Sequence, residues 1–250
     1  MCYDIQARLE TQRKRYRYWN DAETIKNIEE ILEREQLDDF YHVSGFQHPK
    51  IIAYTNDVAP IAPQWGLIPA WVKSVDQANK IANSTSNARG ESIFEKPAFV
   101  EAAYSKRCLI YVDGFFEHYH YKKQAYPFFI RLKDQSPMIL AGVWAIWKNP
   151  DNGEKIKSFS VVTTKANSML EKIHNADPSN PRMPVILSQD RAEMWLSKIN
   201  NSSDKQMIID LITPFNPDLM ESFSVRKIRG KSALGNVPGA TQKFIYPELV

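Results

Sequence analysis

The pattern of hydrophobic and polar positions divides the chain into many short strands and a few amphipathic helices. A capping box at Asn20 and Glu23, followed by isoleucines and a leucine at helical spacing, predicts a helix that ends near Leu37. Apolar or alternating runs predict strands at 51–54, 107–112, 119–121, 127–132, 183–187 and 223–228. The longest runs, 138–147 and 156–164, flank a turn-forming stretch and are expected to pair with each other.

The second half of the chain carries three further helix signals. Thr164 is predicted to cap a short helix from Lys165 to about Ile173, which leaves His174 at its C-terminal end. Two more helices are expected, one capped by Ser188 and one opened by a capping box at Ser203 and Gln206.

Strands outnumber helices and are mostly joined as hairpins, so the pattern predicts the α+β class. We expect a single domain over residues 1–250, with an antiparallel β-sheet or barrel-like core and flanking helices. No repeat, low-complexity tract or long linker divides the chain.

Composition narrows the class of protein only modestly. The 43% hydrophobic and 24% charged content is that of an ordinary soluble globular protein, and a net charge of +3 says little about partners. Two cysteines cannot form a disulfide framework or a thiolate metal cluster, which suits a reducing compartment. With no signal peptide and no apolar run long enough for a bilayer, we expect a cytoplasmic protein that does not contact membranes.

The start of the chain, Met1-Cys2, carries the most distinctive chemistry. Initiator methionine is usually removed before a small residue, which would leave Cys2 with a free α-amine beside its own thiol. That amine has a pKa of about 8 and the thiol about 8.5, so both are partly reactive near neutral pH. An aldehyde can form an imine with the amine and then be trapped by the sulfur as a five-membered thiazolidine. The alternative is that Cys2 is simply a small apolar residue.

Three stretches could contact nucleic acid. Cations and aromatic rings alternate over residues 13–19, where Arg15 and Arg17 would bind phosphates; the alternative is a solvated helix face with inward tyrosines. Trp65 is expected in the core, whereas Trp71 follows a proline in a loop-like position suited to stacking on a base. Arg89, in a polar loop, is a candidate phosphate ligand.

Two residues are candidates for proton transfer. Glu117 lies among aromatic residues, which we expect to raise its pKa toward neutrality, although a lone glutamate can also reach solvent from a strand edge. His174, at a predicted helix C-terminus, could act as a general acid or serve only as a cap. His118 and His120 would share one face of a strand, but without a matching cysteine or carboxylate they predict no metal site.

Together these segments resemble the SRAP family, the SOS response-associated peptidase-like proteins that shield abasic sites in DNA. The resemblance extends over positions 1 to about 200 and rests on separate blocks that occur in the family's order. They are Met1-Cys2, 65–71, 87–91, 107–117, 141–144, 163–167, Ile173-His174 and 182–187.

The resemblance implies a function and a set of roles. Family members bind abasic sites in single-stranded DNA and link them covalently to the N-terminal cysteine as a thiazolidine, without a cofactor or metal. Carried onto this sequence, Cys2 is the nucleophile, His174 and Glu117 move protons, and Asn87 hydrogen-bonds the linkage. The implied DNA contacts come from Arg89, Trp71, Arg15 and Arg17. We expect a monomer that acts on single-stranded DNA, with lyase and autopeptidase activity as further expectations.

Two alternatives remain. The same residues could serve a cysteine peptidase or N-terminal-nucleophile amide hydrolase, including removal of Met1 by the protein itself. A non-covalent single-strand binder would rely on the cations at 13–17 and on Trp71. One departure also matters, because Tyr3-Asp4 stands where the family commonly has Gly-Arg and exchanges a phosphate-binding cation for an anion.

Overall fold

The computed structural model describes residues 2–12, 22–56 and 59–249. Two sheets carry the fold, and the first has five strands in the spatial order β13-β8-β7-β1-β2. Its pairings are all antiparallel. The strands are β1 (Asp4–Ala7), β2 (Phe40–Ser44), β7 (Gly114–Tyr121), β8 (Gln124–Leu132) and β13 (Met220–Ser224).

The second sheet follows the order β11-β10-β9-β6-β3. Three short strands pair with strands of this order: β12 with β9, and β4 and β5 with β10. Two of these, β4 and β5, run parallel to β10, whereas the other pairings of this sheet are antiparallel, as expected for the core. Its strands are β3 (Ala53–Tyr54), β4 (Gln64–Trp65), β5 (Asn87–Arg89), β6 (Arg107–Val112), β9 (Met138–Lys148), β10 (Lys155–Lys165), β11 (Arg182–Pro184) and β12 (Ile186–Leu187).

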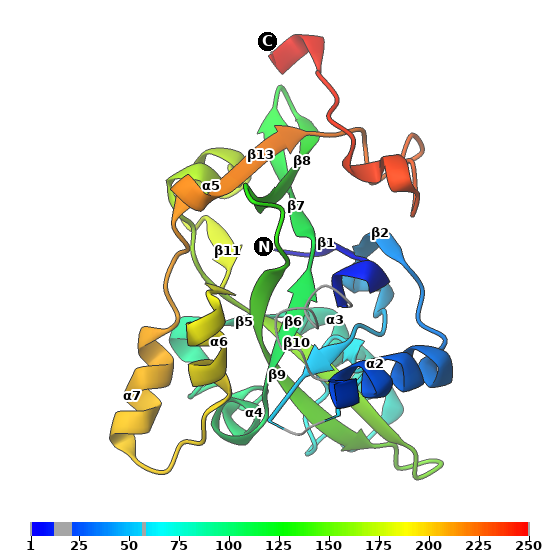
Figure 1. The fold of residues 1–250 in the computed structure, drawn as a ribbon, viewed down its shortest axis with the longest axis vertical. Helices are drawn as coiled ribbons and strands as arrows, with labels where there is room; N and C mark the ends of the chain where they lie inside the picture. Colours follow the sequence, from blue (N-terminus) through cyan, green and yellow to red (C-terminus); the bar gives the residue numbers. More distant parts are fainter. Residues whose placement is uncertain (1, 13–21, 57–58, 250) are drawn as a thin grey trace.

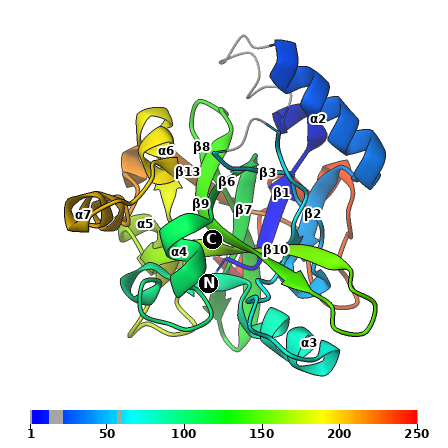
Figure 2. The same cartoon turned by 90° about the horizontal axis from the view of Figure 1, so that it is seen from below.

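Helices lie around the sheets, which confirms the predicted α+β class. Figures 1 and 2 show α6 and α7 on one side of the molecule and α2 on the opposite side. The helices are α2 (Ala22–Glu35), α3 (Val75–Ser84), α4 (Val100–Ser105), α5 (Ser168–Ile173), α6 (Gln189–Leu196) and α7 (Ser202–Asp210). The described ranges also contain five 3-10 turns: Gly45–Gln47, Gly90–Ser92, Pro217–Leu219, Pro238–Thr241 and Pro247–Leu249. Within the described ranges no helix is long and apolar enough to cross a bilayer.

The largest buried cluster joins the two sheets. It includes Ile5 and Val43 from the first sheet and Ile110 and Val161 from the second. Trp65 belongs to the same cluster and is fully buried, as expected. β6 is buried along its whole length, which explains its continuous apolar run.

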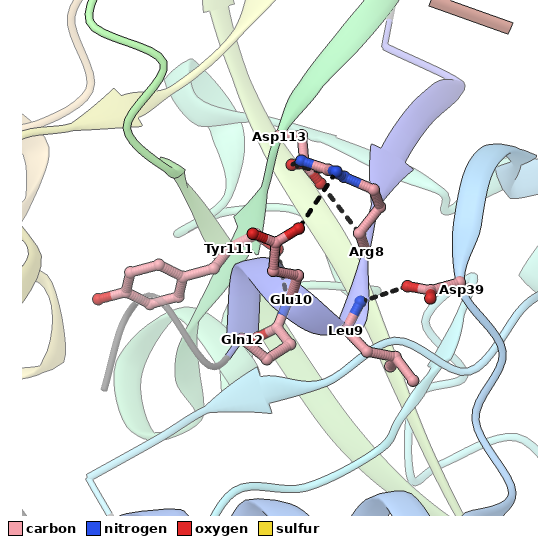
Figure 3. Close-up of polar contacts among 7 residues, drawn as sticks. All are labelled: Arg8, Leu9, Glu10, Gln12, Asp39, Tyr111 and Asp113. Carbon is pink, nitrogen blue, oxygen red and sulfur yellow. Dashed lines mark hydrogen bonds and ion pairs between the residues drawn. The ribbon is translucent and has the colours of Figure 1, made fainter. Parts of the chain in front are cut away.

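The two sheets are connected at Asp113-Gly114, where β6 ends and β7 begins. A Cβ at Gly114 would lie 2.3 Å from the carbonyl oxygen of Ile130, so only glycine fits against the neighbouring strand. The Asp113 carboxylate accepts hydrogen bonds of 3.0 Å from both the backbone amide and the Nε of Arg8 (Figure 3). Nearby, Gln12 donates to the Tyr111 carbonyl at 2.9 Å. These contacts fix the chain just after the C-terminal end of β1, and they therefore also help to fix the N-terminal end of this short strand.

Two predicted helix caps are wrong. Residue Thr164 does not cap a helix, because β10 continues through Lys165 and pairs with β11 there. The cap of α5 is Asn167, whose side chain accepts the Leu170 amide. Likewise α7 is capped by Asn201, one position before the helix, and not by a box at Ser203. The predicted cap at Asn20 lies outside the described residues.

The hairpin expected around residues 122–124 is confirmed and is longer than predicted. Lys122 and Lys123 form its tight turn with positive φ values, the conformation that two-residue hairpin loops require. The last strand was predicted at 223–228 but is β13, Met220–Ser224. Its pairing with β8 stops where Val225 donates to the carbonyl of Pro127, since proline has no N–H to continue the ladder.

Candidate functional site

Cys2 lies at the N-terminal end of β1, in the cluster between the two sheets. Its side chain is 1% exposed. Burial raises the pKa of the thiol, and the nearby negative charge of Glu117 raises it further. The thiol is therefore protonated in this structure, and Glu117 lies close enough for its charge to affect the sulfur.

Glu117 and His174 form a buried acid–imidazole pair beside Cys2. His174 Nδ1 lies 2.8 Å from Glu117 Oε2, and the other carboxylate oxygen accepts the backbone amide of His118 at 2.9 Å. The sequence predicted a raised pKa for Glu117, and this is wrong. Burial does act to raise it, but the hydrogen bonds from His174 and His118 hold the pKa of Glu117 below its ordinary value. Glu117 is therefore a carboxylate at neutral pH.

The ionised carboxylate fixes the roles of the two imidazole nitrogens. A carboxylate can only accept, so Nδ1 of His174 donates to Glu117. Nε2 is then the ring nitrogen that can exchange a proton with a substrate.

Asn175 holds this pair together. Its side-chain oxygen accepts the His120 amide at 2.7 Å, and its side-chain nitrogen donates to the His120 carbonyl at 2.9 Å. The two bonds attach the residue after His174 to β7, three positions beyond Glu117. The sequence analysis missed Asn175, because an asparagine after a helix is an ordinary capping signal.

Asn87 and Arg89 share one face of β5, with Ala88 buried on the other. The amide oxygen and nitrogen of Asn87 are both buried, and neither makes a well-formed hydrogen bond within the described residues. The Asn87 amide is nevertheless close enough to the Tyr3 hydroxyl to influence its pKa, which burial raises. An unsatisfied buried amide is costly unless a ligand uses it, so Asn87 is well suited to bind one.

A bidentate ion pair supports the turn after β5. Arg182, almost fully buried, contacts the two oxygens of Glu91 at 2.7 and 2.8 Å and donates to the Thr163 carbonyl at 2.8 Å. These bonds tie β11 to the segment that follows Arg89. The pair therefore fixes the position of the Asn87 strand.

An open cavity of about 560 Å³ adjoins Glu117 and His174. Its lining comes in part from the C-terminal half of β7, from β8 and from the C-terminal segment (residues 225–249). The lining residues are Tyr3, Asp4, Glu117, His118, His120, Gln124, Ala125, Pro127, His174, Ala176, Lys227, Ile228, Arg229 and Ser232.

Asp4 does not add a free anion to this cavity. It is 1% exposed, and its carboxylate contacts His42 Nε2 at 3.0 Å and the guanidinium of Arg229. Burial acts to raise the pKa of Asp4, but these two partners hold it below the ordinary value. Asp4 is an anion, as expected from the sequence, but its carboxylate is paired with a cation from the C-terminal segment.

The comparisons with known proteins identify the family of the chain. The family model for SOS response associated peptidase (SRAP) matches residues 3–231. The chain belongs to the SRAP family. This confirms the resemblance drawn from the separate sequence blocks.

Relatives of this SRAP chain include proteins from bacteria and vertebrates. The Abasic site processing protein YoqW of Bacillus subtilis is 33% identical over 228 residues, which cover 90% of this chain and 91% of the relative. The Abasic site processing protein HMCES of Xenopus tropicalis is 30% identical over 154 residues, covering 54% of this chain and 44% of the relative. A crystal structure of a Bacteroides thetaiotaomicron protein superimposes with a TM-score of 0.83 at 30% identity, covering 98% of this chain and 100% of that one.

The described residues that were predicted to contact DNA lie outside the cavity, unlike Glu117 and His174, which line it. Trp71 is 47% exposed and donates to the Pro97 carbonyl at 3.2 Å, but it does not line the cavity. Arg89 is exposed on the same strand as Asn87 and also lies outside the cavity lining. Arg15 and Arg17 fall outside the described residues. No cluster of three or more potential metal-ligating His, Cys, Asp or Glu side chains occurs among the residues described.

Proposed function

We propose that this protein captures abasic sites in single-stranded DNA as a covalent thiazolidine on Cys2. The observation that carries the proposal is the buried position of Cys2 just before β1, beside Glu117, whose pair with His174 lines an open cavity. The names of the relatives support the substrate class, because several are abasic site processing proteins.

The chemistry begins with removal of Met1, which exposes the α-amine of Cys2. The open-chain abasic sugar presents an aldehyde, and the amine adds to it to give a carbinolamine. Loss of one water yields an imine, and addition of the thiol to the imine carbon closes the five-membered ring. The thiol proton passes to the nitrogen, so the net change is aldehyde plus aminothiol giving thiazolidine plus one water.

His174 and Glu117 supply the proton transfers. Nε2 of His174 is the donor for sugar ring opening and for the departing hydroxyl of the carbinolamine. Glu117, as a carboxylate, stabilises the protonated imidazole between these steps and provides a negative charge close to the iminium. The roles differ from the sequence-based expectation, in which Glu117 itself was to be a near-neutral acid.

The remaining residues hold the DNA. Asn87 has the unsatisfied buried amide that can hydrogen-bond the linked sugar, and Arg89 on the same face is placed for a flanking phosphate. Trp71 offers an exposed ring for base stacking, and Arg15 and Arg17 would add phosphate contacts. The described site draws on one chain, so the proposal requires no partner subunit.

The test is incubation of the purified protein with a single strand carrying one abasic site, followed by denaturing electrophoresis. We expect a heat-stable adduct with wild type and none with Cys2→Ala, which keeps the amine but loses the thiol. The proposal would be refuted if wild-type protein gave no adduct although its mass showed that Met1 had been removed.

The peptidase alternative makes a different prediction. An activated cysteine nucleophile has a lowered thiol pKa, whereas burial and Glu117 raise the pKa of Cys2. We therefore expect no turnover of peptide substrates added in trans. Cysteine-dependent cleavage of such a substrate would favour the peptidase function.

A further inference from the structure

Among the described residues that line the cavity, Arg229 is the one arginine, and it comes from an irregular part of the chain far from the N-terminus in sequence. The hydrogen bond that the structure describes for its guanidinium uses Nη2 and goes to the buried carboxylate of Asp4. The Arg229 side chain is still 45% exposed. The contact therefore positions the guanidinium at the edge of the cavity without covering it.

An aromatic pair lies beside this guanidinium. The rings of Tyr3 and Phe46 stack with centroids 4.6 Å apart, and the guanidinium carbon of Arg229 is 5.6 Å from the Phe46 centroid. Phe46 is 51% exposed. An exposed ring next to an arginine matches single-stranded nucleic acid, in which each phosphate is followed by a base with a flat face.

The backbone that carries Arg229 is fixed at several points. Val225 donates to the Pro127 carbonyl at 3.0 Å, and Phe244 donates to the Ser224 carbonyl at 2.8 Å. Further along, Asn236 accepts the Tyr41 amide at 2.7 Å and so attaches the segment to β2. Arg229 therefore lies on a well-anchored segment rather than on a free tail.

Resting on the function proposed above, we propose that Arg229, held by Asp4, binds a backbone phosphate of the single strand next to the abasic sugar. A phosphate is the ligand because the guanidinium borders the cavity that contains Glu117 and His174, and a strand whose sugar reaches these groups carries phosphates within a few ångströms of it. Phe46 then offers the exposed part of its ring to the adjoining nucleotide. Asp4, two residues from Cys2, thereby links the position of the bound phosphate to the position of the nucleophile.

The test uses a double variant that preserves charge. Arg229→Gln alone would leave the buried Asp4 carboxylate without one of its partners, so the fold could suffer. Asp4→Asn combined with Arg229→Gln removes both charges and leaves the net charge of the protein unchanged. Its melting temperature is compared with wild type to verify folding.

Binding is measured by fluorescence anisotropy with an intact single strand that has no abasic site, over a series of KCl concentrations. We expect the double variant to bind about tenfold more weakly at low salt, with a log–log salt slope reduced in magnitude by about 0.7, the value for one lost single-strand phosphate contact. Arg229→Lys should recover part of the affinity. Arg226→Gln, an exposed arginine of the same segment that does not line the cavity, should bind like wild type.

A folded double variant with wild-type affinity and wild-type salt slope would overturn this inference. An equal loss of affinity in Arg226→Gln would do the same, because it would show a general charge effect. The cross-linking gel with the abasic strand tests the proposed function separately. If the wild-type protein gives no adduct, the proposed function is refuted. If the wild-type protein gives the adduct but the double variant binds the intact strand as well as wild type does, only the role of Arg229 is refuted.

Discussion

The region around Cys2 and the C-terminal segment border the same cavity but are built differently. Cys2 and Glu117 are buried and His174 is only slightly exposed, and they are held by a sheet and by the Asn175 bonds to His120. The C-terminal segment is mostly exposed and is attached by backbone bonds at Val225 and Phe244, by side-chain-to-backbone bonds, and by Lys227 over the Tyr126 ring at 4.4 Å. The difference separates two tasks: a rigid buried region for the bond-forming chemistry, and an exposed region for holding the strand.

The largest expected effect comes from removing the carboxylate at the buried pair. Glu117→Gln should slow adduct formation by about 10²–10⁴-fold, because the neutral amide cannot stabilise the protonated imidazole. Affinity for an intact strand should stay within about twofold of wild type. Single-turnover time courses on denaturing gels measure the first quantity and anisotropy the second.

The matched control for this change is Glu221→Gln, which alters a glutamate of the same sheet that pairs with Arg131 away from the cavity. Its cross-linking rate should equal that of wild type. If Glu117→Gln keeps a rate within about threefold of wild type, then the pair is structural and the proposed separation of tasks is wrong.

The next largest effect is expected on folding stability, from a substitution at Gly114, where β7 begins. Gly114→Ala places a methyl group 2.3 Å from the Ile130 carbonyl oxygen, so the free energy of unfolding should fall by about 1–3 kcal/mol. Urea denaturation measures this loss. Gly239→Ala in the C-terminal segment, where the nearest atom would be 3.8 Å away, should be nearly neutral. A comparable loss of stability at both glycines would contradict the contrast between a tightly packed buried region and an exposed one.

A smaller effect is expected when the attachment of His174 is loosened. Asn175→Ala removes both bonds to His120, so His174 is held less firmly against Glu117 and adduct formation at saturating DNA should slow by about tenfold. Asn175→Asp keeps the acceptor for the His120 amide and should give an intermediate rate. A change confined to DNA affinity, with the saturated rate unaltered, would show that Asn175 does not position the imidazole.

The smallest expected effect is on the pH dependence of folding stability, which protonation of the buried carboxylates changes only in acid. Asp4 and Glu117 have pKa values lowered by their partners in the folded state, so the unfolded chain binds more protons in the acidic range. Their contribution to stability is complete above the ordinary carboxyl pKa of about 4 and is lost as the pH falls through the lower folded values. Urea denaturation between pH 7 and pH 3 should therefore show a loss only at the acid end. Asp4→Asn should weaken that dependence, and an unchanged pH profile would contradict the described pairing.

The sequence predicted the local features well and the distant contacts poorly. The hairpin of β7 and β8 and the pairing of β9 with β10 follow from short-range alternation and turn residues. The cap at Thr164 was wrong because β10 gains partners from β11, a tertiary contact that overrides the local signal. The parallel pairing of β5 with β10 was not foreseen for a similar reason, since the paired residues are more than 70 positions apart in the sequence.

The candidate site shows the same limit. Cys2, Glu117 and His174 were named from their local chemistry and position, and Asn87 from the family resemblance. No local pattern revealed that Glu117 is ionised by its contact with His174. The partnership of Asp4 with Arg229 joins residues 225 positions apart and involves a segment without helical or strand periodicity. Only the three-dimensional arrangement shows it.

The most direct test of the central claim is the intact mass of the adduct formed with an abasic strand. The account predicts the mass of the chain without Met1 plus the strand minus one water, and no heat-stable adduct from Cys2→Ser, which retains the amine but not the thiol. An adduct whose protein part retains Met1, or an equally stable adduct from Cys2→Ser, would contradict the account.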